Sequence, residues 1–136
     1  MNATSMPNAA AKINVLVVDD QHCIVDLLSD IVDGLGFTSD VAHDGQEAME
    51  KFDGGNFHLV ITDIKMPRMD GVELMKRIKE TRPDVPVIAI TGYGTEGAQE
   101  DTFCDGMDGF LEKPFRVAKI ESMICEVLKR FELLDF

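Results

Sequence analysis

The chain has 136 residues, and its 13 Lys and Arg against 25 Asp and Glu give a formal net charge of −12 at pH 7. Proteins that bind nucleic acid or anionic membranes without sequence preference need basic surfaces, so this charge argues against both activities. Hydrophobic residues form 45% of the chain, which is enough for the core of one globular domain. The longest apolar runs are only as long as strands, so we expect no membrane-spanning segment.

Five short apolar runs predict strands, and most are too continuously apolar to have one face in water. They cover residues 13–18, 37–42, 57–62, 85–91 and 108–111. Between them, apolar residues at helical spacing predict a helix over 24–35 and a last helix over 120–131. Two more helices are expected to begin at Asp44 and Asp70, because each is followed three residues later by glutamate, as in a capping box. The glycine-containing stretch 92–106 predicts only a weak helix.

This alternation predicts a doubly wound α/β domain, in which a five-stranded parallel sheet is covered by helices on both faces. We expect the domain over residues 12–131, with disordered tails at 1–11 and 132–136 and no second domain. The polar start of the chain lacks the features of a secretory signal, and we expect a cytoplasmic protein. The three cysteines are therefore expected to be buried, reduced thiols, and the three histidines show no metal-ligand spacing.

Polar side chains lie at the carboxyl ends of four predicted strands. Asp19 and Asp20 follow the first strand, Asp63 follows the third, Thr91 ends the fourth and Lys113 comes soon after the fifth. These ends meet at one edge of a parallel sheet, where doubly wound proteins bind ligands. Three carboxylates at that edge repel one another unless a cation lies among them, and oxygen ligands without His or Cys favour Mg²⁺. With a hydroxyl and an ammonium group nearby, the set indicates phosphoryl transfer.

Each of these residues also has an ordinary structural interpretation. Asp19 and Asp20 are at a position where Asp often caps the next helix, Thr91 alone is typical of a strand end, and Lys113 alone is typical of a solvated surface. Asp63 is harder to explain in this way, since a carboxylate at the end of a buried strand needs a partner. The convergence of groups from several strands on one edge favours a functional site.

Four motifs in this order resemble those of the receiver domains of two-component response regulators. They are VVDD at 17–20, TDIKMPRMDG at 62–71, ITGY at 90–93 and FLEKPF at 110–115. Each motif alone is weak, but four in order with compatible spacing are highly specific, and the resemblance covers about residues 13–131. It implies the strand order 2-1-3-4-5 of a chemotaxis member of the family, and a cis peptide bond before Pro114.

The resemblance implies that Asp63 is the phosphoacceptor. The phosphoryl group would come from a phosphohistidine of a sensor histidine kinase or a histidine phosphotransfer protein. Asp20 would ligate Mg²⁺ directly and Asp19 mainly through water, with an oxygen of Asp63 and the backbone carbonyl of Lys65 completing the protein ligands. Such a protein catalyses only its own phosphorylation and dephosphorylation and is otherwise not an enzyme.

By the same resemblance, Lys113 and Thr91 would contact the phosphoryl oxygens after transfer. Thr91 would turn toward the phosphoryl group and Phe110 would fill the space that it leaves, so the two residues would form a switch. The surface that changes would consist of residues 92–106, the fifth strand and the last helix, and would bind a downstream protein target. Residues 83–112 contain seven acids and no Lys or Arg, which favours either a target with a basic surface or simply a solvated acidic face.

Two positions are expected to set the lifetime of the phosphorylated state. Lys65 and Tyr93 lie two residues beyond Asp63 and Thr91, at positions that tune hydrolysis in the family. Neither is a carboxylate or carboxamide that readily orients an attacking water. The sequence therefore predicts a comparatively long-lived acyl phosphate.

Two other functions stay open. A Mg²⁺-dependent phosphohydrolase with an aspartyl nucleophile is expected to carry Asp-x-Asp after the first strand and an inserted cap, whereas Asp19 and Asp20 are adjacent and no insertion is visible. A docking module that keeps the fold without phosphorylation is expected to lose acidic, Thr or Lys positions of the site, and this chain has all of them.

Overall fold

The computed structural model describes residues 13–92 and 106–133. The strands in these ranges are β1 (Asn14–Val18), β2 (Thr38–Ala42), β3 (Leu59–Asp63), β4 (Val87–Thr91) and β5 (Gly109–Glu112). The helices are α2 (His22–Gly34), α3 (Gly45–Gly54), α4 (Gly71–Thr81) and α6 (Val117–Arg130). The expected tail at 1–11, most of the weak helix at 92–106, Tyr93 and Cys104 lie outside the described residues.

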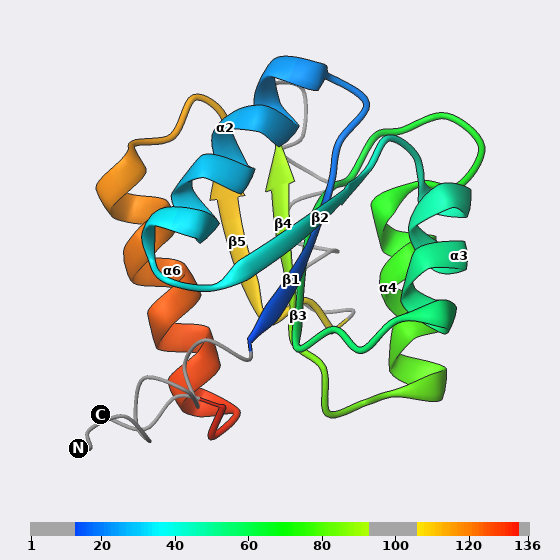
Figure 1. Ribbon diagram of the computed structural model, residues 1–136. Coiled ribbons are helices and arrows are strands. Elements are labelled where there is room, and N and C mark those ends of the chain that lie inside the picture. Colours follow the sequence, from blue (N-terminus) through cyan, green and yellow to red (C-terminus); the bar gives the residue numbers. More distant parts are fainter. Residues whose placement is uncertain (1–12, 93–105, 134–136) are drawn as a thin grey trace.

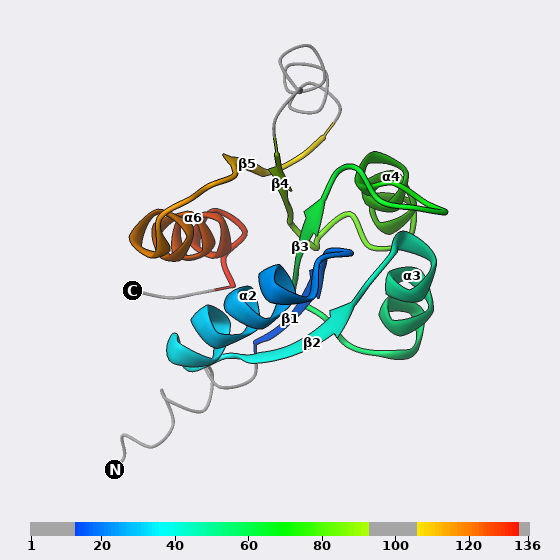
Figure 2. The same ribbon diagram turned by 90° about the horizontal axis from the view of Figure 1, so that it is seen from above.

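The five strands form one parallel sheet in the order β2-β1-β3-β4-β5. Helices α2 and α6 cover one face of this sheet, and α3 and α4 cover the other (Figures 1 and 2). The predicted doubly wound class and strand order are therefore confirmed. Strand order reverses between β1 and β3, so a crevice is expected beyond their carboxyl ends.

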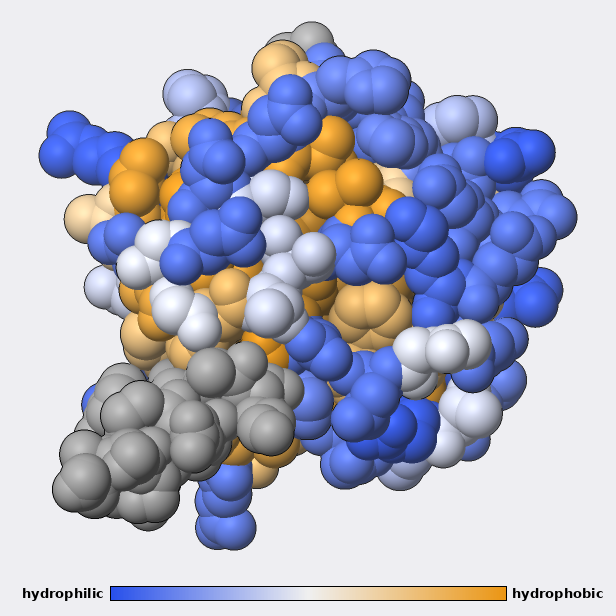
Figure 3. Space-filling view, in the orientation of Figure 1, coloured by the Kyte–Doolittle hydropathy of each residue, from blue (hydrophilic) through white to orange (hydrophobic). Residues whose placement is uncertain are grey.

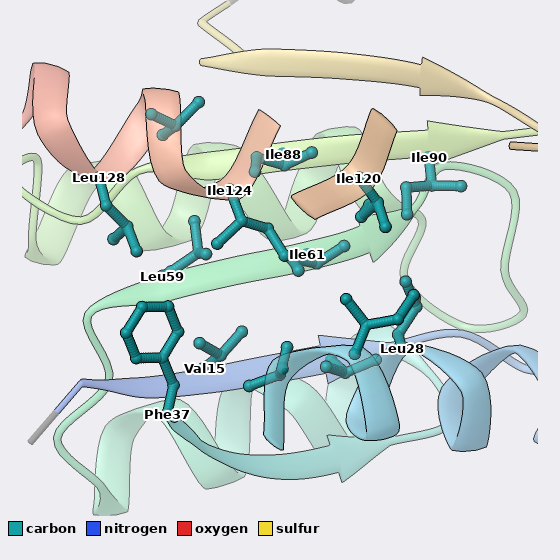
Figure 4. Close-up of a cluster of buried hydrophobic side chains, with 14 of the residues drawn as sticks. Val15, Leu28, Phe37, Leu59, Ile61, Ile88, Ile90, Ile120, Ile124 and Leu128 are labelled. Carbon is teal, nitrogen blue, oxygen red and sulfur yellow. The ribbon is translucent and has the colours of Figure 1, made fainter. Parts of the chain in front are cut away.

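Alternate residues of the strands point into two hydrophobic cores. On one face, side chains such as Val15, Ile61 and Ile88 pack with Leu28 of α2 and Ile124 of α6 (Figure 4). On the other face, a second set packs with α3 and α4, and includes Leu16, Val60, Ala89, Leu74 and Ile78. Hydrophilic side chains cover most of the outer surface of α3 and α4 in Figure 3. None of the helices within the described residues is long and apolar enough to cross a bilayer.

The two predicted N-caps are present. An oxygen of Asp44 accepts a hydrogen bond from the Glu47 amide at 2.8 Å, and Asp70 accepts one from the Glu73 amide at 2.9 Å. In a capping box, the glutamate side chain also accepts a hydrogen bond from the N-cap amide. Here the two glutamates make other contacts: the Glu47 carboxylate accepts from the His43 amide, and Glu73 pairs with Arg77. The N-cap of α2 is Gln21, so the interpretation of Asp19 or Asp20 as its N-cap is wrong.

The expectation of buried thiols is wrong for Cys23, which is exposed on α2, and Cys125 on α6 is only partly buried. Cys23 lies in the first turn of α2, where the buried stripe has not yet begun, since the first buried residue of this helix is Val25. The ring of His22, beside Cys23, lies 4.5 Å from the ring of His43. Within the described ranges, neither His22 nor His43 belongs to a group of three or more His, Cys, Asp or Glu residues that could hold a metal ion.

His58 joins the start of β3 to the start of β1, at the edge of the sheet opposite the carboxyl ends. Its Nδ1 accepts a hydrogen bond from the Asn14 amide at 3.0 Å. Burial lowers the pKa of His58 below its ordinary value, and the charge of Arg82 lowers it further, while Asp84 opposes the shift. The folded protein therefore favours the neutral imidazole.

We predict that His58 makes folding sensitive to mild acid. The unfolded chain takes up this proton first, so the free energy of unfolding is retained above about pH 6.5 and decreases as pH falls toward 5. The variant His58→Asn keeps an acceptor for the Asn14 amide but does not titrate. Urea unfolding of both proteins between about pH 7 and 5 should give a flatter profile for the variant. Parallel profiles would show that His58 has no part in the pH dependence.

Candidate functional site

A cleft of about 530 Å³ opens beyond the carboxyl ends of β1, β3, β4 and β5. Its walls include five residues that the sequence places in the site: Asp20, Asp63, Lys65, Thr91 and Lys113. Asp19 lies at the same edge, is buried, and contacts Lys113. The structure thus brings together side chains that are up to 94 residues apart in sequence.

Three carboxylates meet in this cleft. Each of Asp19, Asp20 and Asp63 has a carboxylate oxygen within 4.8 Å of an oxygen of the other two. Asp19 and Asp63 are buried, whereas Asp20 is exposed at the mouth. Burial raises the pKa of Asp19, although hydrogen bonds from Gln21 and Lys113 lower it and only partly offset the effect. Oxygen ligands of this charge and spacing, with one face open to solvent, fit a hard divalent cation such as Mg²⁺.

Lys113 supplies the positive charge next to these acids. Its Nζ lies 2.9 Å from an oxygen of Asp19 and 3.1 Å from Asp63 Oδ2, and its side chain is only 16% exposed. Desolvation alone lowers the pKa of Lys113, but the hydrogen bonds to Asp19 and Asp63 outweigh it, so the pKa is raised. The lysine is therefore charged at neutral pH and compensates part of the repulsion between the carboxylates.

Asp63 is held in place from three sides. Its Oδ1 accepts a hydrogen bond from the Ile64 amide at 2.7 Å, and its Oδ2 faces Lys113. The first residue of α4 packs against the Asp63 backbone so closely that a Cβ on Gly71 would lie 2.1 Å from the Asp63 carbonyl oxygen. Asp63 ends a fully buried strand, so its carboxylate is both fixed and reachable from the cleft.

Thr91 and Phe110 lie on the same face of the sheet. In the register of β4 and β5, Ala89 is opposite Phe110 and Thr91 is opposite Glu112. Side chains alternate along a strand, so Thr91 projects to the same side as Ala89 and Phe110, one step closer to the cleft. Thr91 is 1% exposed and Phe110 is 8% exposed in the core beside α4.

A family model, the response regulator receiver domain, matches residues 15–125. The chain belongs to this family. Among curated proteins, it is 32% identical to two-component response regulator 24 of Arabidopsis thaliana, over 90% of this chain and 89% of that protein. It is 31% identical to the transcriptional regulatory protein FixJ of Bradyrhizobium diazoefficiens, over 88% of this chain and 58% of FixJ. The chain spans little more than half the length of FixJ and of several other curated relatives.

Solved receiver domains have the same architecture. One from Clostridium thermocellum superposes with a TM-score of 0.83 at 26% identity, covering 90% of this chain and 99% of that one. TrrA from Thermotoga maritima, solved in complex with Mg²⁺ and BeF, gives a TM-score of 0.77 at 31% identity, covering 85% and 99% of the two chains.

Two residues of this receiver domain contact the site or its loops and were not singled out from the sequence. Gln21 accepts a hydrogen bond from Lys113 Nζ at 3.2 Å, and its position directly after Asp19 and Asp20 was the available signal. Arg68 forms an ion pair with Asp44 across two loops. Arg68 lies within a recognised motif, but its partner is 24 residues away and no pattern in the sequence links the two.

Proposed function

We propose that this receiver domain is a phosphorylation-dependent switch in which Asp63 accepts a phosphoryl group from a phosphohistidine. Receiver domains are signalling modules that histidine kinases or histidine phosphotransfer proteins phosphorylate, and this coarser role follows from the family. The observation that carries the proposal is the convergence of Asp63, two further carboxylates and Lys113 in one cleft. Membership of the family also favours a switch over a phosphohydrolase of free substrates.

In the proposed transfer, an oxygen of Asp63 attacks phosphorus while the bond to the histidine nitrogen breaks. The electron pair of that bond stays on the imidazole, and the carboxylate becomes an acyl phosphate. Fixing Asp63 through the Ile64 amide leaves the carboxylate one orientation from which to attack, which lowers the entropic part of the barrier.

Charge neutralisation is the second contribution of the site. Asp20, Asp63 and the Lys65 carbonyl would hold Mg²⁺, and Asp19 would act mainly through water. The bound cation would neutralise the carboxylates and polarise the phosphoryl oxygens. Lys113 is charged and close to Asp63 Oδ2, so it is suited to bind a phosphoryl oxygen there.

Thr91 and Phe110 are proposed to carry the signal to the surface. A Thr91 hydroxyl that turns to a phosphoryl oxygen would leave space on the side of the sheet that it shares with Phe110. The affected surface would consist of residues 92–106, β5 and α6, where we propose that a target protein binds.

Two of the acids in residues 83–112 are paired with basic side chains. Of the seven acids in 83–112, Asp84 pairs with Arg82 and Asp108 pairs with the partly buried Lys79, so these two do not present free charge. The proposal of a basic target therefore rests on the other five acids. Binding that does not weaken as salt is raised would overturn the basic target.

The proposed function is tested by titrating the protein with Mg²⁺ and beryllofluoride, which mimics a phosphoryl group, while amide resonances are recorded by NMR. We expect Mg²⁺-dependent shifts at Thr91, Phe110 and Lys113 in the wild type, and none with beryllofluoride in Asp63→Asn. Identical responses of the two proteins would contradict the proposal.

The lifetime of the acyl phosphate gives a separate prediction. Replacing Lys65 by Asn and Tyr93 by Glu introduces groups that can orient a water, so dephosphorylation should become roughly tenfold faster, well short of the effect of a fully built general base. The measurement is loss of radiolabel from the phosphorylated protein after the donor is removed. An unchanged or slower rate in the double variant would show that these positions do not limit hydrolysis here.

A further inference from the structure

The loop between β3 and α4 is tied to the N-terminus of α3 by an ion pair. Arg68 Nη2 lies 2.5 Å from Asp44 Oδ2. The other oxygen of Asp44 accepts the Glu47 amide and caps α3, so the carboxylate is fixed before Arg68 reaches it. The hydrogen bond from the Glu47 amide, together with Arg68, lowers the pKa of Asp44, although burial opposes the shift. Arg68 therefore binds an ionised, anchored partner.

The backbone at Arg68 is in the left-handed region, with a φ of 71°. This conformation is uncommon for a residue with a side chain and persists only where its surroundings hold it. The Arg68 side chain is 60% exposed, and its guanidinium pairs with Asp44. The Met69 amide donates to the Pro67 carbonyl at 2.8 Å and closes a tight turn around Arg68. The ion pair then anchors the side chain of this turn to α3.

Two backbone contacts show how closely the same loop is packed. A Cβ on Gly45 would lie 2.3 Å from the Met69 carbonyl oxygen, so the loop lies directly on the first turn of α3. At its far end, the Gly71 amide donates to the Ile64 carbonyl at 2.7 Å. Between these fixed points lies Lys65, which lines the acidic cleft.

We propose that Arg68 is a positioning residue for the acidic site: its ion pair with Asp44 holds the β3–α4 loop in the conformation that presents the Lys65 carbonyl to a bound divalent cation. This inference rests on the proposed function, because it assigns the Lys65 carbonyl to the cation. The physical reason is preorganisation, since a carbonyl ligand on a loop that must first be ordered binds a cation less tightly. Arg68 itself touches neither the cation nor the phosphoryl group.

The test is the affinity of the whole chain for Mg²⁺, measured by calorimetry without any phosphodonor. Arg68→Ala removes the ion pair, and we expect Mg²⁺ affinity to fall about tenfold, the lower end of the losses seen when groups that orient metal ligands are removed. Arg68→Lys keeps a charge that can reach Asp44 and should restore most of the affinity. Asp44→Asn keeps an oxygen for the Glu47 amide but loses the negative charge, so it should weaken Mg²⁺ binding as much as Arg68→Ala does. The double variant Arg68→Ala/Asp44→Asn should bind Mg²⁺ no more weakly than either single variant.

A second readout does not depend on the cation. In the metal-free protein, the Met69 and Gly71 amides should exchange with solvent faster in Arg68→Ala than in the wild type. The matched control is Arg77→Ala, which removes an exposed arginine–glutamate pair within α4, away from the cleft. This control should leave both Mg²⁺ affinity and loop exchange unchanged.

The outcomes separate the two proposals. Arg68→Ala that is folded by circular dichroism and binds Mg²⁺ as tightly as the wild type would overturn the positioning role and leave the proposed function standing. Equal losses in Arg68→Ala and Arg77→Ala would also overturn it, because the effect would then be general. A wild type that binds no Mg²⁺ would overturn the proposed function itself.

Discussion

Replacing Asp63 by Asn is expected to abolish phosphorylation. The variant keeps the size of the side chain and an oxygen for the Ile64 amide, but it loses the nucleophilic carboxylate next to Lys113. Labelling with a small phosphodonor and Mg²⁺ should fall by about 10³-fold or more, as when the nucleophile of a site is removed. The measurement is incorporation of radiolabelled phosphate over time.

The matched control is Asp53→Asn. Asp53 is an exposed aspartate on α3, outside the residues that line the cleft. Its replacement removes the same charge from the protein and should leave the labelling rate unchanged. If Asp63→Asn were labelled as fast as this control, another residue would be the acceptor and the assignment of Asp63 would fail.

Gly71→Ala is expected to be the most damaging small substitution at the site. The added Cβ would lie 2.1 Å from the Asp63 carbonyl oxygen and 2.9 Å from Ile64 Cα, and both neighbours are backbone atoms that cannot rotate away. Either α4 moves away from β3 or the end of β3 shifts. We predict a loss of about 3 kcal/mol in the free energy of unfolding, at the upper end of the cost of overpacking.

Gly34→Ala provides the comparison for Gly71→Ala. Gly34 is the last residue of α2, and a Cβ there would meet nothing within 4 Å. Because alanine favours helix more than glycine does, this variant should be more stable, by up to about 1 kcal/mol. Urea unfolding of both variants measures the difference. Equal stabilities would mean that the close approach of Gly71 to β3 has no energetic consequence.

Much of the fold could be predicted because its signals are local. Apolar runs located the strands to within a few residues, and Asp44 and Asp70 marked two helix starts through their spacing to glutamate. The strand order has no local signal; it was predicted from the resemblance to receiver domains, and the sheet confirms it. The stretch 92–106 was irregular in sequence, and most of it is not among the described residues.

The candidate site also has a part that local sequence signals predict and a part that they do not. Asp19, Asp20, Asp63 and Lys113 were predictable because each comes just after a strand, and parallel strands bring such positions to one edge. The pair of Arg68 and Asp44 was not predictable, because it depends on how two loops fold against each other. Exposure of Cys23 was missed for a related reason, since a helical pattern does not say where the buried stripe of α2 begins.

The most direct test of the phosphoacceptor is chemical identification of the modified residue. The protein is incubated with Mg²⁺ and a small phosphodonor, reduced with borohydride, which converts an aspartyl phosphate to homoserine, and digested for mass spectrometry. The account predicts homoserine at position 63 of the wild type, dependent on Mg²⁺ and absent from the Asp63→Asn variant. Homoserine at another aspartate, or its formation at position 63 without Mg²⁺, would contradict the account.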